Sequence, residues 1–236
     1  MMLTLEQLCV DIAGVKVLRN ISAHLQAGTT VAVVGRNGAG KTSLLRSIMG
    51  LLKADSGRIQ LGEHALLSLP AHQRAHLGIG YAPEDRIIFP TLNVQANLRL
   101  PCEVLGMTPH ALQQRQDAVL EVVPQLKDML KRSGAALSGG QGKMVALGRA
   151  LMVGHRLVLL DEPLQGLAPV LAQQYVEAIG RLRQWQPGLC VLITESNAGL
   201  MADMPDQTWT LERGSLSFNA PPSPLNNLME NNTWPR

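Results

Sequence analysis

The 236-residue sequence predicts an α/β fold in which helices cover a parallel β-sheet, and three observations support this prediction. An apolar run at residues 30–34 leads into a glycine-rich turn, and a helical pattern follows the turn. A second apolar run, at residues 157–160, ends in two carboxylates. Such continuous apolar runs are typical of parallel strands that are covered on both faces. Ligands are therefore expected at the carboxyl edge of this sheet.

Strand and helix signals then follow one another in chain order. Residues 3–10 and 15–25 show partial alternation of apolar and polar positions, which predicts an antiparallel strand pair. The other expected elements are strands at 30–34, 58–61, 79–82, 157–160 and 189–194, helices at 41–50, 70–77, 93–105, 109–126, 143–153 and 171–182, and a hairpin formed by 209–211 and 215–218. Residues 219–236 have no periodicity, and they are expected to form a flexible tail.

Composition narrows the class of protein. The net charge of +3 is too small to indicate a nucleic-acid partner. No apolar stretch approaches the ~18 residues of a membrane span, and the N-terminus lacks the features of a signal peptide. Three widely spaced cysteines (Cys9, Cys102 and Cys190) form no zinc or redox pattern and fit a reducing compartment. The expected location is the cytoplasm.

Residues 35–42 have the sequence GRNGAGKT, a full match to the phosphate-binding pattern G-x-x-x-x-G-K-[ST]. The glycines let successive backbone N–H groups face an anion, and the following helix adds its positive end. Lys41 is expected to reach the β- and γ-phosphates, and Thr42 to ligate Mg²⁺. The alternative is an ordinary glycine-rich turn. The nucleotide-binding residues expected here are Gly35, Arg36, Asn37, Gly38, Ala39, Gly40, Lys41, Thr42 and Ser43.

Two carboxylates follow the buried strand at residues 157–160, in the sequence Asp161-Glu162-Pro163. Asp161 suits Mg²⁺, through the water shell of the ion, and Glu162 suits the orientation of an attacking water. The alternative is that this sequence only ends a strand. Its position downstream of the phosphate-binding loop favours the functional interpretation.

A third motif, LSGGQ at residues 137–141, opens the helix expected at 143–153. Ser138 suits an N-cap, and two glycines leave backbone N–H groups bare. By itself the motif fits an ordinary capped loop and a second anion site on a helix N-terminus equally well.

Together the three motifs, in this order and spacing, resemble the ATP-binding subunits of ABC transporters over residues 3–218. Within that family the chain looks like the ATPases of branched-chain amino acid importers. Three segments carry this closer resemblance: GIGYAPEDR at 78–86, IFPTL at 88–92, and GLAP at 166–169 after Asp161-Glu162-Pro163. Importers of urea and short amides have close relatives, so an importer of that class is the alternative within the family.

The resemblance implies a P-loop NTPase fold with a RecA-like lobe, an antiparallel β lobe and an inserted α-helical lobe. The RecA-like and β lobes would comprise residues 1–83 and 154–218, and the helical lobe residues 84–153. ATP and Mg²⁺ are the implied cofactors. The family works as a head-to-tail dimer, in which the motif around Ser138, Gly139, Gly140 and Gln141 serves the partner's nucleotide.

The implied partners are a second ABC ATPase chain, identical or different, integral membrane permease subunits and, indirectly, a periplasmic substrate-binding protein. The chain is then expected at the cytoplasmic face of the inner membrane as a peripheral subunit. Residues 84–91 are the segment expected to contact the membrane subunits, the alternative being a plain surface loop.

Three positions depart from the family pattern. Glu84 stands where many members have Gln, and it is expected to ligate Mg²⁺ as well. Ile12 lies where many members stack an aromatic ring on adenine. Ser196 stands where many members have a His that contacts the γ-phosphate. We therefore hypothesise that this chain hydrolyses ATP slowly alone and pairs with a different ATPase chain.

The leading prediction is an ATPase that drives uptake of branched-chain amino acids or similar small polar solutes. A urea or short-amide importer is the closest alternative. A soluble ABC ATPase acting in DNA repair or translation is less favoured, because such proteins usually carry two cassettes or long coiled-coil inserts. Glu162 argues against a subunit that binds nucleotide without hydrolysing it. Ser196, in place of the usual His, remains consistent with that alternative.

Overall fold

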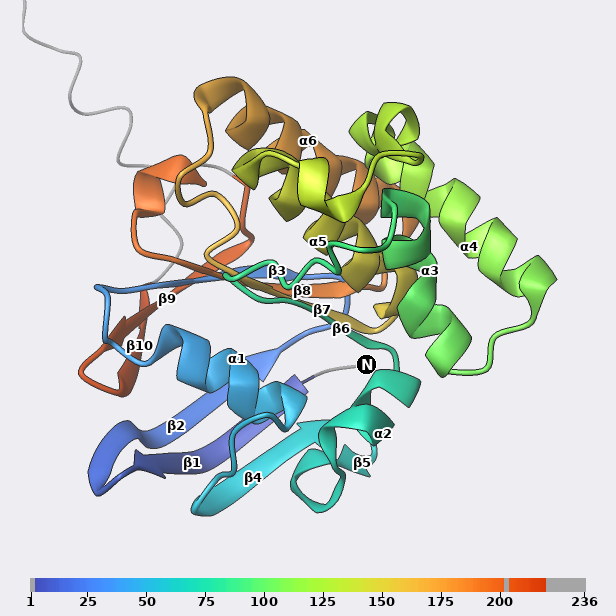
Figure 1. Ribbon diagram of the computed structural model, residues 1–236. Helices are drawn as coiled ribbons and strands as arrows, with labels where there is room; N and C mark the ends of the chain where they lie inside the picture. The colour runs from blue at the N-terminus through green and yellow to red at the C-terminus, as the bar shows by residue number, and fades with distance from the viewer. Residues whose placement is uncertain (1–2, 202–203, 220–236) are drawn as a thin grey trace, which may run out of the picture.

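The computed structural model describes residues 3–201 and 204–219, which fold into two sheets and six α-helices within that part of the chain (Figure 1). The tail expected at residues 219–236 lies outside the described residues except for Asn219, which ends the last strand. One sheet has four strands in the order β2-β1-β4-β5, and the other has six in the order β10-β9-β3-β8-β7-β6.

The four-stranded sheet is antiparallel and consists of β1 (Leu3–Ile12), β2 (Val15–Leu25), β4 (Ser56–Leu61) and β5 (His64–Ala65). The expected antiparallel pairing of the first two strands is confirmed. The register shifts along β1, and Gln7 has a φ of 48°, so β-bulges interrupt the pleat. These bulges explain why the alternation of apolar residues in this segment is only partial.

The six-stranded sheet consists of β3 (Thr30–Val34), β6 (Ile79–Ala82), β7 (Leu157–Asp161), β8 (Cys190–Glu195), β9 (Gln207–Glu212) and β10 (Ser215–Asn219). Its strands run parallel except for β10, which pairs with β9 in the predicted hairpin. The strands β3, β7 and β8 are almost entirely buried, as continuous apolar runs predict.

The helices are α1 (Lys41–Met49), α2 (Ala71–His76), α3 (Val94–Val104), α4 (Pro109–Val122), α5 (Gly139–Val153) and α6 (Pro169–Trp185). Short 3₁₀ turns occupy η1 (Leu66–Ser68), η2 (Pro124–Met129), η3 (Gly134–Ala136) and η4 (Ala198–Leu200). Some expected helix bounds were wrong, and the helix expected at 171–182 in fact spans Pro169–Trp185. The helix expected to reach residue 126 ends at Val122, because Pro124 lacks an N–H and restricts the residue before it. The helix expected from residue 143 begins at Gly139.

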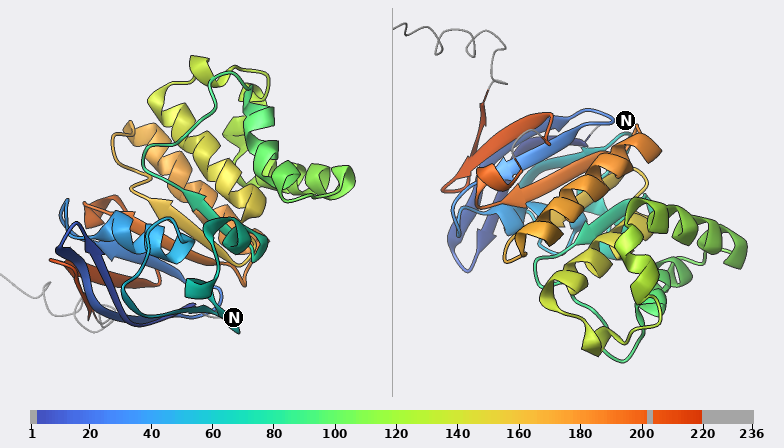
Figure 2. Two further views of the ribbon diagram at one scale, coloured as in Figure 1. Left: turned by 60° about the horizontal axis from the view of Figure 1, so that its bottom comes forward. Right: turned by 90° about the horizontal axis from the view of Figure 1, so that it is seen from above.

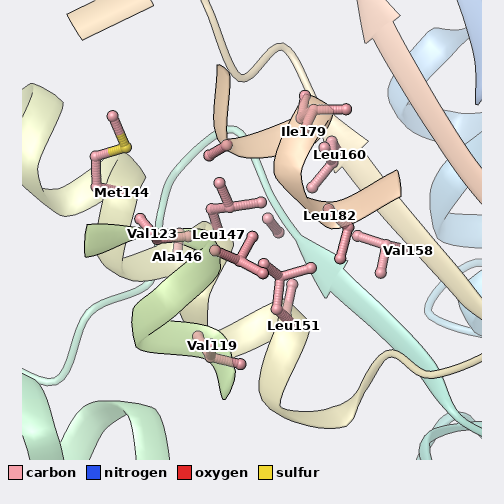
Figure 3. Close-up of a cluster of buried hydrophobic side chains, with 14 of the residues drawn as sticks. Val119, Val123, Met144, Ala146, Leu147, Leu151, Val158, Leu160, Ile179 and Leu182 are labelled. Carbon is pink, nitrogen blue, oxygen red and sulfur yellow. The ribbon is translucent and has the colours of Figure 1, made fainter. Parts of the chain in front are cut away.

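Two clusters of buried apolar side chains hold these layers together. One lies between the sheets, around α1, which Figure 1 shows between β1, β2 and the parallel sheet. The other joins α3, α4, α5 and α6 to the opposite face of the parallel sheet. Figure 3 shows its centre, where Leu147 and Leu151 of α5 lie near Val158 of β7 and Leu182 of α6. Figure 2 shows α3 and α4 set to one side of the sheet.

The strand order places three segments that carry predicted site residues side by side. β8 lies between β3 and β7, with Val34 opposite Glu195 and Thr194 opposite Asp161. Each of these strands ends at the same edge, because all three run parallel. The phosphate-binding loop follows β3, Glu162 follows β7, and Ser196 follows β8. The fold therefore brings together residues that are more than 100 positions apart in sequence.

Candidate active site

The phosphate-binding loop ends at the N-terminus of α1 with its backbone donors uncapped. Gly40 is the N-cap residue, has a φ of 110°, and makes no side-chain cap hydrogen bond. At Gly35 a β-carbon would lie 2.2 Å from the Leu211 carbonyl oxygen, so only glycine fits there. The N–H groups of the first turn of α1 therefore remain available to an anion.

A cavity of about 320 Å³ lies at this N-terminus. It is lined by Val17, Asn37, Gly38, Gly40, Lys41, Thr42, Ser43, Glu84, Glu162 and Gln165. The cavity thus contains most of the predicted loop together with the predicted catalytic carboxylate. Arg36 and Ala39 line a neighbouring cavity, with Gly35, at the β9–β10 hairpin.

Lys41 is buried, and its ammonium group has four acceptors around it. The Nζ atom lies 2.6 Å from the Gly35 carbonyl oxygen and 3.1 Å from that of Arg36. It also lies 3.0 Å from Glu162 Oε1 and 3.1 Å from Ser196 Oγ. An ammonium group has three protons, so it cannot satisfy all four acceptors at once. An entering phosphate oxygen therefore competes with Glu162 for Lys41.

Asp161 is held by three hydroxyl groups at the end of β7. Its Oδ1 accepts from Thr194 Oγ1 at 2.8 Å and from Thr42 Oγ1 at 3.1 Å, and its Oδ2 accepts from Tyr81 at 3.2 Å. Burial raises the pKa of Asp161, and these hydrogen bonds oppose the rise. The carboxylate therefore lies beside the Thr42 hydroxyl, as a shared metal site requires.

Glu162 sits in a strained backbone conformation at the loop after β7. Its φ is 45°, a region that non-glycine residues rarely adopt. Its N–H donates to the backbone oxygen and to the hydroxyl of Thr194, both at 3.1 Å. Within the described residues its Oε2 atom is buried and has no hydrogen-bond partner. Strain and an unsatisfied oxygen together are typical of a functional position.

Ser196 joins three parts of the site. Its Oγ lies 2.7 Å from Asn37 Oδ1, 2.7 Å from Glu162 Oε1 and 3.1 Å from Lys41 Nζ. A hydroxyl carries one proton, so Ser196 donates to either Asn37 or Glu162 at a given moment. Ser196, which follows β8, therefore contacts both Lys41 and the predicted catalytic carboxylate of Glu162.

The predicted metal ligands fit a magnesium ion that also takes oxygens from phosphate and water. Thr42 and Glu84 line the same cavity, and Thr42 contacts Asp161. Among the described residues no three His, Cys, Asp or Glu side chains cluster closely enough to hold a metal. Mg²⁺ usually takes only one or two carboxylates and completes its shell with water and phosphates.

Ile12 lies apart from this cavity's lining. It is 43% exposed at the end of β1, and Val17 of β2 lines the cavity instead. An apolar wall beside the phosphate-binding loop is therefore present in the chain, although no sequence pattern indicates Val17.

The LSGGQ motif forms a complete capping box on α5. Ser138 Oγ accepts from the Gln141 N–H at 3.3 Å, and Gln141 Oε1 accepts from the Ser138 N–H at 3.0 Å. Gly139 and Ser138 line two further cavities near Arg86, whereas the 320 Å³ cavity is lined by the loop that contains Lys41. The two predicted anion-binding motifs thus line different cavities.

Sequence reasoning missed two charged residues behind the site. Lys143, on α5, donates to the carbonyl oxygens of Glu162 and Gln165. Glu195, at the end of β8, accepts from the Leu164 N–H at 2.8 Å. Burial raises the pKa of Glu195 to about 7, and Glu162 adds to the rise, while the Leu164 N–H, Lys143 and Lys41 oppose it. No motif signals either residue, because both act on backbone groups of a distant loop.

Within the described residues, no helix combines the length and the apolar character needed to cross a bilayer.

The sequence and fold match one family throughout. The family model described as "ABC transporter" matches residues 18–165, more than half of the chain. The high-affinity branched-chain amino acid transport ATP-binding protein BraG of Pseudomonas aeruginosa is 34% identical over 215 residues, covering 91% of each chain. The lipopolysaccharide export system ATP-binding protein LptB of Haemophilus influenzae is 32% identical over 228 residues, covering 95% of this chain and 92% of LptB.

Solved structures agree with these sequence matches. The ADP conformation of MJ1267, an ATP-binding cassette of an ABC transporter, superposes with a TM-score of 0.79 at 26% identity, covering 92% of this chain and 89% of MJ1267. The predicted fold class and the predicted ATPase activity are both confirmed by these matches. The chain belongs to the ABC transporter family and is an ATP-binding subunit that hydrolyses ATP.

Proposed function

We propose that this ATPase drives the import of branched-chain amino acids or similar small polar solutes. The observation that supports the solute class is the 34% identity to BraG over 91% of both chains. The 32% identity to LptB makes lipopolysaccharide export the second candidate. A urea or short-amide importer and a non-transport ABC ATPase are the remaining alternatives. Loss of the gene would reduce urea uptake in the first case and would leave leucine uptake, urea uptake and lipopolysaccharide export all normal in the second.

Within the site, the backbone amides of the phosphate-binding loop and Lys41 hold the β- and γ-phosphates of ATP. The Lys41–Glu162 ion pair, 3.0 Å long, opens as the γ-phosphate takes its place beside the ammonium. Thr42, Glu84 and Asp161 would hold Mg²⁺, Asp161 through the water shell of the ion, and the ion would supply positive charge that neutralises the phosphates. Glu162, released from Lys41, orients the attacking water.

Two departures from the family pattern set the rate and affinity of the site. Ile12 contributes at most an apolar contact to adenine. Ser196 offers a neutral hydroxyl at the variable position after β8, where it donates to Glu162 or to Asn37. This hydroxyl carries no positive charge toward the γ-phosphate, so the isolated chain hydrolyses ATP slowly. Faster turnover then requires a second, different ATPase chain.

The partners follow from the two anion-binding motifs. Ser138, Gly139, Gly140 and Gln141 face the nucleotide of a second ATPase chain, in a head-to-tail dimer. Residues 84–91 contact integral membrane permease subunits at the cytoplasmic face of the membrane, and through them a periplasmic substrate-binding protein. Ile87 and Phe89 are 58% and 42% exposed in this segment. Arg149 of α5 ties the segment to the helix of Ser138, because it donates to the carbonyl oxygens of Arg86 and Ile87.

The catalytic part is tested with Glu162→Gln in the purified chain. ATP binding should stay within about twofold, and hydrolysis should fall by about 10²–10⁴-fold, the usual range for a positioned base. The exposed Glu63→Gln is the matched control and should leave both unchanged. Hydrolysis by Glu162→Gln at the wild-type rate would show that another group orients the water.

The same assay tests Ser196. The chain alone should turn over ATP more slowly than the dimer assembled with its partner ATPase. Brisk hydrolysis by the lone chain, undiminished in Ser196→Ala, would contradict the proposal.

For the solute, a strain lacking this gene should lose uptake of radiolabelled leucine and regain it with the wild-type gene. Normal leucine uptake combined with loss of urea uptake or of lipopolysaccharide export would assign the alternative.

A further inference from the structure

The loop that follows β7 is connected to α5 by the side chain of Lys143. Lys143 Nζ, on α5, donates to the Glu162 carbonyl oxygen at 2.6 Å and to the Gln165 carbonyl oxygen at 2.8 Å. These two carbonyls mark the start and the end of residues 162–165, which we name the 162–165 loop. A single ammonium group thus connects both ends of this loop to the second turn of α5.

The loop is fixed on its opposite side by β8. Glu195 Oε1 accepts from the Leu164 N–H at 2.8 Å, and Thr194 accepts from the Glu162 N–H. The contacts from α5 and from β8 therefore bind different backbone groups of the same four residues. Because the φ of Glu162 is 45°, this conformation is costly and persists only where surrounding contacts hold it.

Lys143 occupies this place at an energetic cost, which argues against an incidental contact. Its side chain is partly buried, and burial lowers the pKa of its ammonium group. The carboxylates of Glu195, Glu84 and Glu162 oppose that effect. A surface lysine normally keeps its charged end in water. Here the ammonium instead points to two backbone carbonyls beside the catalytic residue.

We propose that Lys143 is a positioning residue that holds Glu162 in its catalytic orientation by tying the 162–165 loop to α5. Ser138 caps the start of α5, and Lys143 lies on the same helix. A displacement of α5 would therefore move the Lys143 ammonium group and, through it, the backbone of Glu162. The proposal rests on the proposed role of Glu162 in orienting water, and it deepens that role by naming what places the carboxylate.

The test compares two variants. Lys143→Met keeps a long unbranched side chain but loses the ammonium N–H donors, and Lys143→Arg keeps both the positive charge and N–H donors. Lys143→Met should lower kcat by about 10- to 100-fold, since small misplacements of a catalytic group cost this much. The Kd for ATP should stay within about twofold, and Lys143→Arg should recover most of kcat. The exposed Lys53→Met is the matched control. Wild-type kcat in Lys143→Met, or equal losses in the Arg and Met variants, would overturn the proposal.

A second set of variants separates this inference from the role of Glu162. In a Glu162→Gln background, Lys143→Met should cause no further loss of kcat, because Lys143 acts only through Glu162. An additive loss would overturn the positioning role. If Glu162→Gln alone leaves hydrolysis intact, the proposed function of Glu162 fails instead, and the two failures are thus distinguishable.

Hydrogen exchange in the full chain gives a readout that needs no turnover. Lys143→Met should speed exchange of the Leu164 and Gln165 amides by about tenfold or more, because the loop opens locally more often. Exchange in β7 and α1 should stay unchanged. Unaltered exchange in the 162–165 loop would overturn the proposal, and so would a rise spread equally over β7 and α1, which indicates general destabilisation.

Discussion

The buried carboxyl group of Glu195 makes the stability of this protein depend on pH in an unusual direction. Glu195 is 1% exposed, and its pKa is raised from 4.5 to about 7, mainly by burial. The folded protein therefore binds a proton on Glu195 more tightly than the unfolded chain does. The free energy of unfolding contributed by this group is highest below pH 4.5 and falls as the pH rises to about 7.

The magnitude follows from the size of that change. Each tenfold change in proton affinity corresponds to about 1.4 kcal/mol, so the full loss between the two pKa values is about 3 kcal/mol. Glu195→Gln keeps an oxygen that can accept from the Leu164 N–H, and it removes the ionisation. Relative to the wild type, the variant should therefore gain about 3 kcal/mol between about pH 4 and about pH 8.

The assay is urea denaturation of wild type and Glu195→Gln at several pH values across this range, followed by circular dichroism. The exposed Glu63→Gln serves as the control and should change the free energy of unfolding by less than about 0.5 kcal/mol throughout. A stability difference between Glu195→Gln and wild type that stays constant with pH would refute the reasoning. A difference that shrinks as the pH rises would refute it as well.

Two further substitutions test the site and the core. Thr194→Val keeps the side-chain volume but removes the 2.8 Å donor to Asp161, so the free energy of unfolding should fall by about 1.5–3 kcal/mol in urea denaturation. A loss below about 0.5 kcal/mol would mean that this hydrogen bond is not needed. Leu151→Ala empties a fully buried position between α5 and the sheet, so unfolding should become easier by about 2–5 kcal/mol, whereas Leu151→Met should cost under about 1.5 kcal/mol. Equal costs for Ala and Met would contradict tight packing there.

The residues proposed to bind nucleotide and Mg²⁺ and to orient water could be picked out from the sequence because each lies in a local pattern. The loop from Gly35 to Thr42 needs only glycines at fixed positions, a preceding strand and a following helix. Asp161 and Glu162 follow a continuous apolar run, so the sequence places them at the edge of a parallel sheet. The N-cap role of Ser138 is equally local, since it involves only the next turn of the helix.

The end of α4 was also encoded locally, although the prediction extended the helix to residue 126. Pro124 cannot donate a backbone hydrogen bond, and it restricts the conformation of the residue before it. The apolar periodicity continues through η2, because a 3₁₀ turn still buries Leu126 against the helical cluster. Burial and helix type are different properties, and periodicity reports only the first.

The sequence by itself determined the phosphate-binding loop, the carboxylates of Asp161 and Glu162 at the end of the apolar run, and the capped start of α5, because each depends on contacts within a few residues. The tertiary structure alone decided that Lys143 and Glu195 hold the loop of Glu162 and that Val17, rather than Ile12, lines the cavity. These contacts join segments that are far apart along the chain. They form only after strand order and helix packing have set the distances, and backbone carbonyls and N–H groups, which every residue carries, leave no signature in the sequence.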